Sequence, residues 1–149
     1  MQYLYGLARA GLPEVDELMR HVREHAAQAP SFVREAWADV ALPACEELLA
    51  HARGDAEACV RKLGAAMPPL LEIGGSHAQR DLFDQVLLDA TIRSGRLVAA
   101  QRMLELRRHW EPNGVPLNRA LANVYQGLGL PLEAARAAER AKLAMAGRA

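Results

Sequence analysis

Residues 95–134 read GRLVAAQRMLELRRHWEPNGVPLNRALANVYQGLGLPLEA, and Gly95 is followed 34 residues later by Gly129. The same offset relates further pairs around them: Leu87 and Leu121, Ala100 and Ala134, Arg102 and Arg136, and Glu105 and Glu139. Thirty-four residues is the period of the tetratricopeptide repeat, a pair of helices joined by a short turn. Small residues at such positions let two helices approach closely, so the stretch predicts stacked helix pairs.

Apolar residues elsewhere recur three and four positions apart, which is the helical spacing, and glycine or proline interrupts each run. The sequence has no alternating strand pattern. The breaks predict helices over residues 4–11, 13–30, 31–54, 55–70, 76–94, 96–110, 116–128 and 131–146. We expect one domain, residues 1–149, with an all-α, tetratricopeptide-like helical-repeat solenoid of about eight antiparallel helices.

Five residues carry sharper structural predictions. Ser31 and Asp55 are suited to cap a helix start through a side-chain oxygen. Pro43 lies inside a continuous apolar stripe and lacks an amide hydrogen, so we expect it to kink that helix. Trp37 and Trp110 lie on or beside apolar faces, which favours packing over ligand binding.

The composition disfavours several classes of partner. The 149 residues include 18 basic and 18 acidic side chains, and the formal net charge of zero gives no general attraction to nucleic acid or anionic lipid. The two cysteines, Cys45 and Cys59, each lie among apolar residues, which is typical of buried thiols in a reducing compartment. The sequence contains no leader-like or membrane-spanning stretch, so we predict a cytoplasmic protein.

The chain also resembles a known family over part of its length. Residues 52–55 read ARGD, residues 73–81 read IGGSHAQRD, and a later helix ends in a turn at Pro112 and Asn113. From about Ser31 to Leu128 this pattern is similar to the C-terminal part of the tetratricopeptide repeat protein 38-like family. The resemblance implies a helical-repeat fold with no established catalytic activity. It also implies that the chain is the C-terminal portion of a longer architecture.

The run from Ser76 to Asp81 gathers reactive side chains at one helix start. Ser76 and Gln79 fit a capping box, and His77 can pair with Asp81 four residues on, as Arg80 can with a later aspartate. We interpret the run as a junction between repeats. The alternatives are a partner or anion site at the exposed amides and a catalytic His–Asp couple.

A second pattern is capable of binding a metal. His21, Glu24 and His25 fit the His-x-x-Glu-His arrangement of inverted zinc peptidases, in which helical spacing brings two imidazoles and a carboxylate together. Such enzymes need a third protein ligand, for which the sequence offers only ordinary acidic residues on later helices. We expect these side chains to border a core, with no metal or cofactor, and a metal-dependent hydrolase is an alternative.

The first helix of each tetratricopeptide pair lines a concave groove. By that resemblance, the groove would be lined by Gln85, Asp89, Arg119, Asn123 and Gln126. Arg119 and Asn123 lie four residues apart and suit a carboxylate or a peptide backbone, because a guanidinium donates two hydrogen bonds and an amide both donates and accepts.

We therefore predict a scaffold that mediates protein or peptide interaction, without catalysis of its own, and with neither nucleic acid nor a membrane as partner. A truncated family fragment and a structural homo-oligomer are the other interpretations. A homo-oligomer would cover an apolar N-terminal end formed by Tyr3, Leu4 and Leu7.

Overall fold

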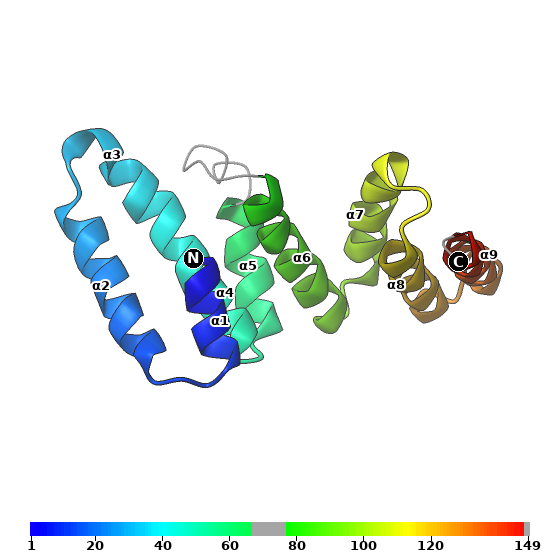
Figure 1. Cartoon of the computed structure of the whole chain (residues 1–149), viewed down its shortest axis with the longest axis horizontal. Coiled ribbons are helices and arrows are strands. Elements are labelled where there is room, and N and C mark those ends of the chain that lie inside the picture. Colours follow the sequence, from blue (N-terminus) through cyan, green and yellow to red (C-terminus); the bar gives the residue numbers. More distant parts are fainter. Residues whose placement is uncertain (67–76, 148–149) are drawn as a thin grey trace. The chain divides into compact units, whose positions relative to one another are not determined.

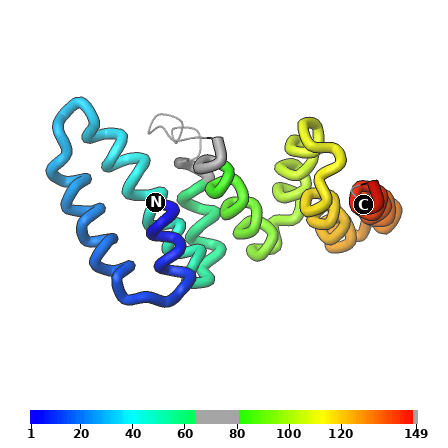
Figure 2. The backbone as a smooth tube through the Cα atoms, in the orientation of Figure 1, coloured from blue at the N-terminus to red at the C-terminus, as the bar shows by residue number. Residues whose placement is uncertain are grey.

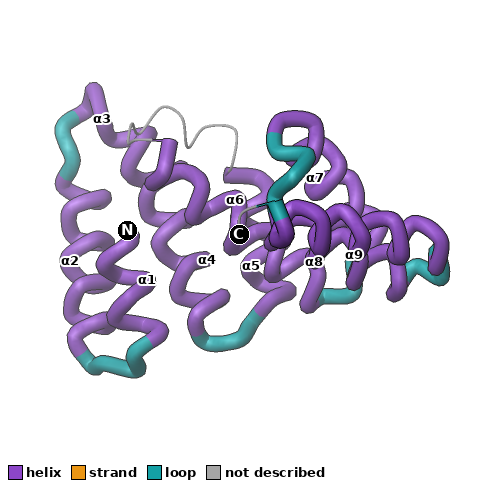
Figure 3. Tube along the Cα trace, turned by 45° about the vertical axis from the view of Figure 1, so that its right-hand side comes forward, coloured by secondary structure: helices purple, strands orange, loops and turns teal. Residues whose placement is uncertain are grey.

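The computed structural model describes residues 1–66 and 77–147, with the side chains of residues 1–63 and 81–147. Within these ranges the ordered elements are all helices and no strand occurs (Figure 3), which confirms the all-α prediction. The residues group into two compact units, Met1–Ala90 and Thr91–Ala149, called here the N-terminal unit and the C-terminal unit.

The N-terminal unit is built around one central helix, α4. In chain order the unit contains α1 (Gln2–Arg9), α2 (Glu14–Gln28), α3 (Ser31–Glu35), the π-helix η1 (Ala36–Ala41), α4 (Leu42–Ala52), α5 (Ala56–Ala66) and most of α6 (His77–Arg93). α4 packs against α1, α2 and α5. Figures 1 and 2 show α2 running beside the continuous path of α3, η1 and α4.

Among the described residues, two apolar clusters hold this unit together. One joins η1, α4, α5 and α6 through Val40, Ala44, Leu48, Cys59, Leu63, Phe83, Val86 and Ala90. The other joins α1, α2 and α4 through Leu4, Val15, Met19, Cys45 and Leu49. Cys45 and Cys59 are free, buried thiols, as predicted. Burial raises the pKa of both, that of Cys59 to about 12, so they are poor nucleophiles at neutral pH.

The N-terminal end differs from the expectation of an uncovered apolar surface. Leu4 is buried in the second cluster and Leu7 packs against that cluster, while Tyr3 is exposed. The chain itself therefore covers Leu4 and part of Leu7, and Tyr3 is the residue of the three that is left exposed.

The π-helix η1 explains how Pro43 fits inside a long helical segment. The predicted kink position coincides with a change of helix type, because η1 ends at Ala41 and Pro43 is the second residue of α4. Proline in an α-helix clashes with the carbonyl four residues earlier and supplies no amide hydrogen. The wider π turn, in which the Leu42 amide donates to the Trp37 carbonyl, accommodates the ring without ending the helix.

The two predicted caps have different outcomes. Asp55 caps α5 as expected, since its Oδ1 accepts the Ala58 amide at 2.9 Å. The prediction for Ser31 is wrong: Ser31 is the first residue of α3, Pro30 occupies the cap position, and no side chain caps that helix start. The extended Pro30 backbone already sets the entry of the chain into the helix.

The C-terminal unit contains α7 (Leu97–Trp110), α8 (Val115–Gly127) and α9 (Pro131–Ala146). α8 packs against both α7 and α9. Four alanines of α7 and α9 are buried, namely Ala100, Ala134, Ala137 and Ala141. Small side chains of this kind leave room for neighbouring helices to approach closely. Across all described residues, no helix is long and apolar enough to cross a bilayer.

One turn geometry recurs in both units. At each of four glycines, the glycine amide donates to the carbonyl three residues earlier, and the next amide donates to the carbonyl five residues before it. The four have left-handed φ angles, namely Gly11 (68°), Gly54 (92°), Gly95 (73°) and Gly129 (72°). This is the Schellman helix ending, which glycine favours because it has no Cβ. The last two of these turns, at Gly95 and Gly129, lie 34 residues apart.

Candidate functional site

The predicted groove residues are all exposed and lie on two helices. Gln85 and Asp89 belong to α6 in the N-terminal unit. Arg119, Asn123 and Gln126 belong to α8 in the C-terminal unit and are spaced to share one face of that helix.

The position of the α8 row follows from the local sequence. The Asn118 amide donates to the Gly114 carbonyl at 2.9 Å as the helix begins, and Leu117, Leu121 and Val124 are buried. Because those residues fix the inward face, Arg119, Asn123 and Gln126 are left in solvent; we call these three the α8 polar row.

One member of the α8 polar row contacts α9. The Arg119 guanidinium lies 3.2 Å from the Met145 sulfur, which is a weak acceptor on an exposed side chain. A thioether is easily displaced by a stronger acceptor, so the guanidinium is available to a carboxylate.

The two α6 residues are engaged inside the N-terminal unit. Gln85 donates to Asp81 at 2.5 Å, and Asp89 accepts from His51 at 2.8 Å. These contacts make Gln85 and Asp89 less suited to bind a ligand than the α8 polar row.

The junction run lies mostly outside the described residues. Ser76 is not described, and neither are the side chains of His77, Gln79 and Arg80, so the capping box and the ion pairs predicted there stay predictions. Asp81 is described, and the Gln85 contact gives it a structural role.

The His-x-x-Glu-His residues each contact another side chain. The Arg20 guanidinium contacts both His21 Nε2, at 2.8 Å, and Glu24, at 2.7 Å. His25 packs edge-on against Trp37 with ring centroids 4.3 Å apart. Among the side chains that the structure describes, no group of three or more His, Cys, Asp or Glu residues could hold a metal ion.

Trp110 differs from the packing prediction, whereas Trp37 agrees with it. Trp37 is half-buried, but Trp110 is 85% exposed at the last position of α7 and contacts only the preceding His109 ring among the aromatic pairs described. Leu106, one turn earlier, is also exposed. An apolar stripe in the sequence does not say whether a helix face has a neighbour.

A three-residue hydrogen-bonded relay was not predicted from the sequence. Tyr5 on α1, His51 on α4 and Asp89 on α6 are linked by contacts of 3.0 Å at His51 Nδ1 and 2.8 Å at His51 Nε2. A carboxylate only accepts hydrogen bonds, so Nε2 carries a proton, and in the neutral imidazole Nδ1 accepts from the Tyr5 hydroxyl. His51 is buried, and the relay joins three helices of the N-terminal unit.

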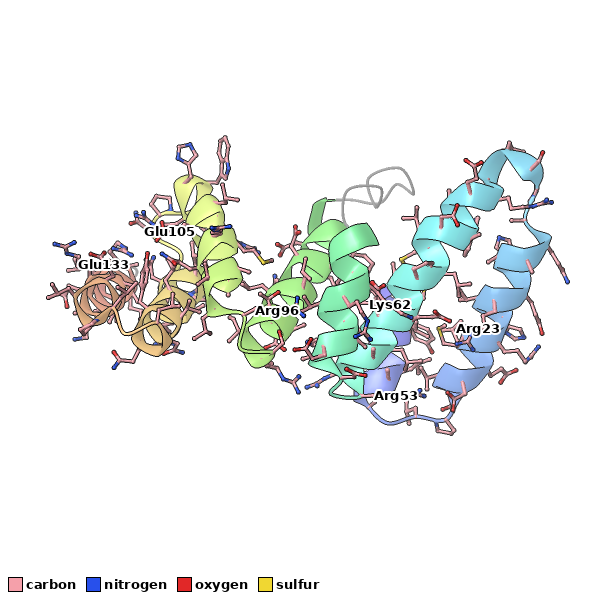
Figure 4. The ribbon with its side chains drawn as sticks, turned by 180° about the vertical axis from the view of Figure 1, so that it is seen from behind. Arg23, Arg53, Lys62, Arg96, Glu105 and Glu133 are labelled. Carbon is pink, nitrogen blue, oxygen red and sulfur yellow. The ribbon has the colours of Figure 1, made fainter. Side chains whose placement is uncertain are left out.

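Two adjacent glutamates on α4 are also unpredicted. Glu46 lies 3.1 Å from Arg23 of α2 and 3.8 Å from Lys62 of α5, and Figure 4 shows these two basic side chains on either side of α4. Glu47 is fully buried, and neither of its carboxyl oxygens has a hydrogen-bond partner among the described residues.

The C-terminal unit has its own polar contacts. Partial burial alone would raise the pKa of Glu105, but hydrogen bonds from Tyr125 and Arg108 outweigh it and lower the pKa. Burial and the same Glu105 contact raise the pKa of Tyr125 to about 12. The hydrogen bond from Tyr125 to Glu105 joins α8 to α7, and at neutral pH Glu105 is ionised while Tyr125 is neutral.

Comparison with known proteins assigns no family to the chain. No protein-family model matches it, and no solved structure matches it. A proposal for the function therefore has to come from the residues themselves.

Proposed function

We propose that the chain is a tetratricopeptide-like helical-repeat scaffold that binds a protein or peptide and has no catalysis of its own. The recurrence of one Schellman turn at four glycines supports the repeat architecture. The buried alanines at the 34-residue offset, Ala100 and Ala134, support close stacking of its helices.

The observation that carries a binding role is the α8 polar row. Arg119, Asn123 and Gln126 present hydrogen-bonding groups from one face of a helix whose other face is buried. A rigid helix holds such groups at fixed spacing, so less conformational freedom is lost on binding than from a loop. Helical-repeat proteins bind extended segments through rows of this kind.

The chemistry of the row favours an extended peptide with a carboxylate. The guanidinium of Arg119 donates two parallel hydrogen bonds to a carboxylate. The amides of Asn123 and Gln126 both donate and accept, which matches alternating backbone groups of a peptide. The near-neutral charge of the chain is consistent with recognition by this local geometry rather than by a general field.

A selection from a random peptide library tests the proposal. We expect the immobilised chain to enrich peptides that share a carboxylate, and the Arg119→Ala, Asn123→Ala, Gln126→Ala triple variant to bind them at least about tenfold more weakly. The matched control is Arg136→Ala, which removes an exposed arginine of α9 paired with Glu133 and should leave affinity unchanged. Peptides that bind the triple variant as tightly as the native chain would disprove a role for the row.

A further inference from the structure

Glu47 is the one buried carboxyl in the described residues that has no hydrogen-bond partner. It lies on α4, its exposure is 0%, and both of its oxygens are unsatisfied. A carboxylate in this position loses its hydration without replacement, whereas the neutral acid loses much less. The geometry therefore favours the protonated form.

The charges nearest Glu47 do not compensate its burial. Lys62 of α5 attracts a negative charge, but its side chain is half exposed and lies 3.8 Å from Glu46. Burial raises the pKa of Glu47 to about 7 against the attraction of Lys62, and the neighbouring Glu46 charge adds to the rise. On α5, burial raises the pKa of the Cys59 thiol, and a negative charge on Glu47 adds to that rise.

The ionisable groups on the other helices around α4 are engaged elsewhere or exposed. Tyr5 of α1 and Asp89 of α6 contact His51, Arg23 of α2 contacts Glu46, and Asp39 of η1 is exposed. None of the contacts described for these groups reaches the Glu47 carboxyl.

We propose that Glu47 is an internal proton-binding site whose deprotonation loosens the packing of α4 against α5. The proton passes to solvent, and the carboxylate left behind draws water or a cation into a contact that is otherwise apolar. This property goes beyond peptide binding and does not depend on it.

The direction of the pH effect follows from the two states of Glu47. In the unfolded chain the carboxyl has its ordinary pKa of 4.5, and in the folded unit the pKa is about 7. Between these values the folded unit holds a proton that the unfolded chain has lost. Stability is therefore full below pH 4.5, falls as pH rises to about 7 and is level above it, and the unfolding equilibrium constant increases up to about tenfold per pH unit in that window.

The experiment measures the unfolding of the N-terminal unit within the full chain. A Trp110→Phe background removes the exposed tryptophan of the other unit, so that Trp37 in η1 reports on the N-terminal unit alone. Urea unfolding is followed by Trp37 fluorescence at fixed pH values from 5 to 8. The variants are Glu47→Gln and Glu47→Met, which remove the carboxyl with little change in volume, and the matched control is Glu46→Gln on the same helix.

We expect the native chain and Glu46→Gln to lose stability over this range, and both Glu47 variants to lose at least about tenfold less in the unfolding equilibrium constant. Equal pH dependence in the native chain and the Glu47 variants would overturn the proposal. If neither Glu47 variant folds, the carboxyl is required for packing at every pH, which also overturns it. In ¹³C spectra of glutamate-labelled chain, the Glu47 carboxyl should titrate near pH 7, and titration near 4.5 would contradict the proposal.

Discussion

The two units each bury a polar side chain completely, but only one of them satisfies it. In the C-terminal unit, Asn118 donates to the carbonyls of Pro112 and Gly114 at 2.8 and 3.0 Å and accepts from Arg140 at 2.8 Å. In the N-terminal unit, Glu47 has no such partner in the described residues. Both side chains are buried between helices. Asn118 stabilises one arrangement of its helices through hydrogen bonds, whereas Glu47 opposes the packing around it.

The difference shows that burial alone does not decide whether a polar side chain stabilises or destabilises its unit. Asn118 is neutral, both of its amide hydrogens are donated and its oxygen accepts one hydrogen bond, so truncating its side chain removes the donor to the Pro112 carbonyl and the acceptor for Arg140. Above its raised pKa of about 7, Glu47 carries a charge that the fold does not balance, so its removal relieves a penalty at those pH values. Substitutions at these two positions should change stability in opposite directions.

The largest expected effect is at Asn118. Asn118→Ala removes three hydrogen bonds, leaves a small cavity and should destabilise the C-terminal unit by about 3 kcal/mol. Hydrogen exchange of α8 and α9 amides, measured by mass spectrometry, reports this unit directly. Asn123→Ala, an exposed asparagine of the same helix, should change stability by less than about 0.5 kcal/mol. Equal losses in both variants would show that the Asn118 contacts contribute little.

The next effect has the opposite sign. Glu47→Met should stabilise the N-terminal unit at pH 8 by on the order of 2 kcal/mol, because an apolar side chain of similar volume replaces an unpaired buried carboxylate. Urea unfolding followed by Trp37 fluorescence measures it. A destabilised variant would mean that the carboxyl has a stabilising partner and that the contrast with Asn118 is wrong.

A smaller loss is expected when the relay in the N-terminal unit is cut. Tyr5→Phe removes the hydroxyl that donates to His51 and leaves a buried acceptor without a partner, at a cost of about 1.5 kcal/mol. The same fluorescence assay measures it. Tyr3→Phe is the control, since Tyr3 is exposed, and it should leave the midpoint unchanged.

The Schellman turn occurs in both units, and substituting its glycine should cost the same stability in each. Gly11→Ala and Gly129→Ala each place a Cβ where nothing lies within 4 Å, so the left-handed backbone alone determines the loss, about 1 kcal/mol in each case. Hydrogen exchange of the flanking helices gives both values. A large difference between the two would show that the turns are not equivalent.

The smallest expected effect is the loss of stability of the C-terminal unit at acid pH. Hydrogen bonds to Glu105 lower its pKa below the ordinary 4.5, so its contribution to stability is present above pH 4.5 and is lost as pH falls through the lowered value. Tyr125→Phe should reduce this loss, by less than about 1 kcal/mol. The N-terminal unit, through Glu47, should instead gain stability between pH 7 and 4.5. Parallel acid profiles of the two units, measured by hydrogen exchange, would contradict this.

The helix ends were predictable from sequence because they depend on local chemistry. The predictions for residues 96–110, 116–128 and 131–146 match α7, α8 and α9 to within one residue at each end, since glycine and proline set those ends directly. The prediction that Ser31 caps a helix is wrong, because the preceding residue, Pro30, occupies the cap position.

The buried polar groups were only partly predictable. Val40, Ala44, Glu47 and His51 follow helical spacing, so burial of the last two could have been inferred from the stripe. Their hydrogen-bonding environment could not be inferred from the sequence. Tyr5, for example, lies 46 residues before His51 in the chain, and no local pattern specifies that contact. For Trp110, the missing information was whether α7 has a neighbour on that side.

The π-helix η1 also determines where the chain tolerates a change of length. Successive residues of an α-helix are rotated by about 100°, so a deletion within α4 would turn Leu48 away from its cluster. A π turn holds one surplus residue, and deleting one residue from Ala36–Ala41 would restore regular α-helix while leaving the flanking turns in phase. Pro43 would then clash with the preceding turn. The chain should therefore tolerate such a deletion only when Pro43 is replaced at the same time.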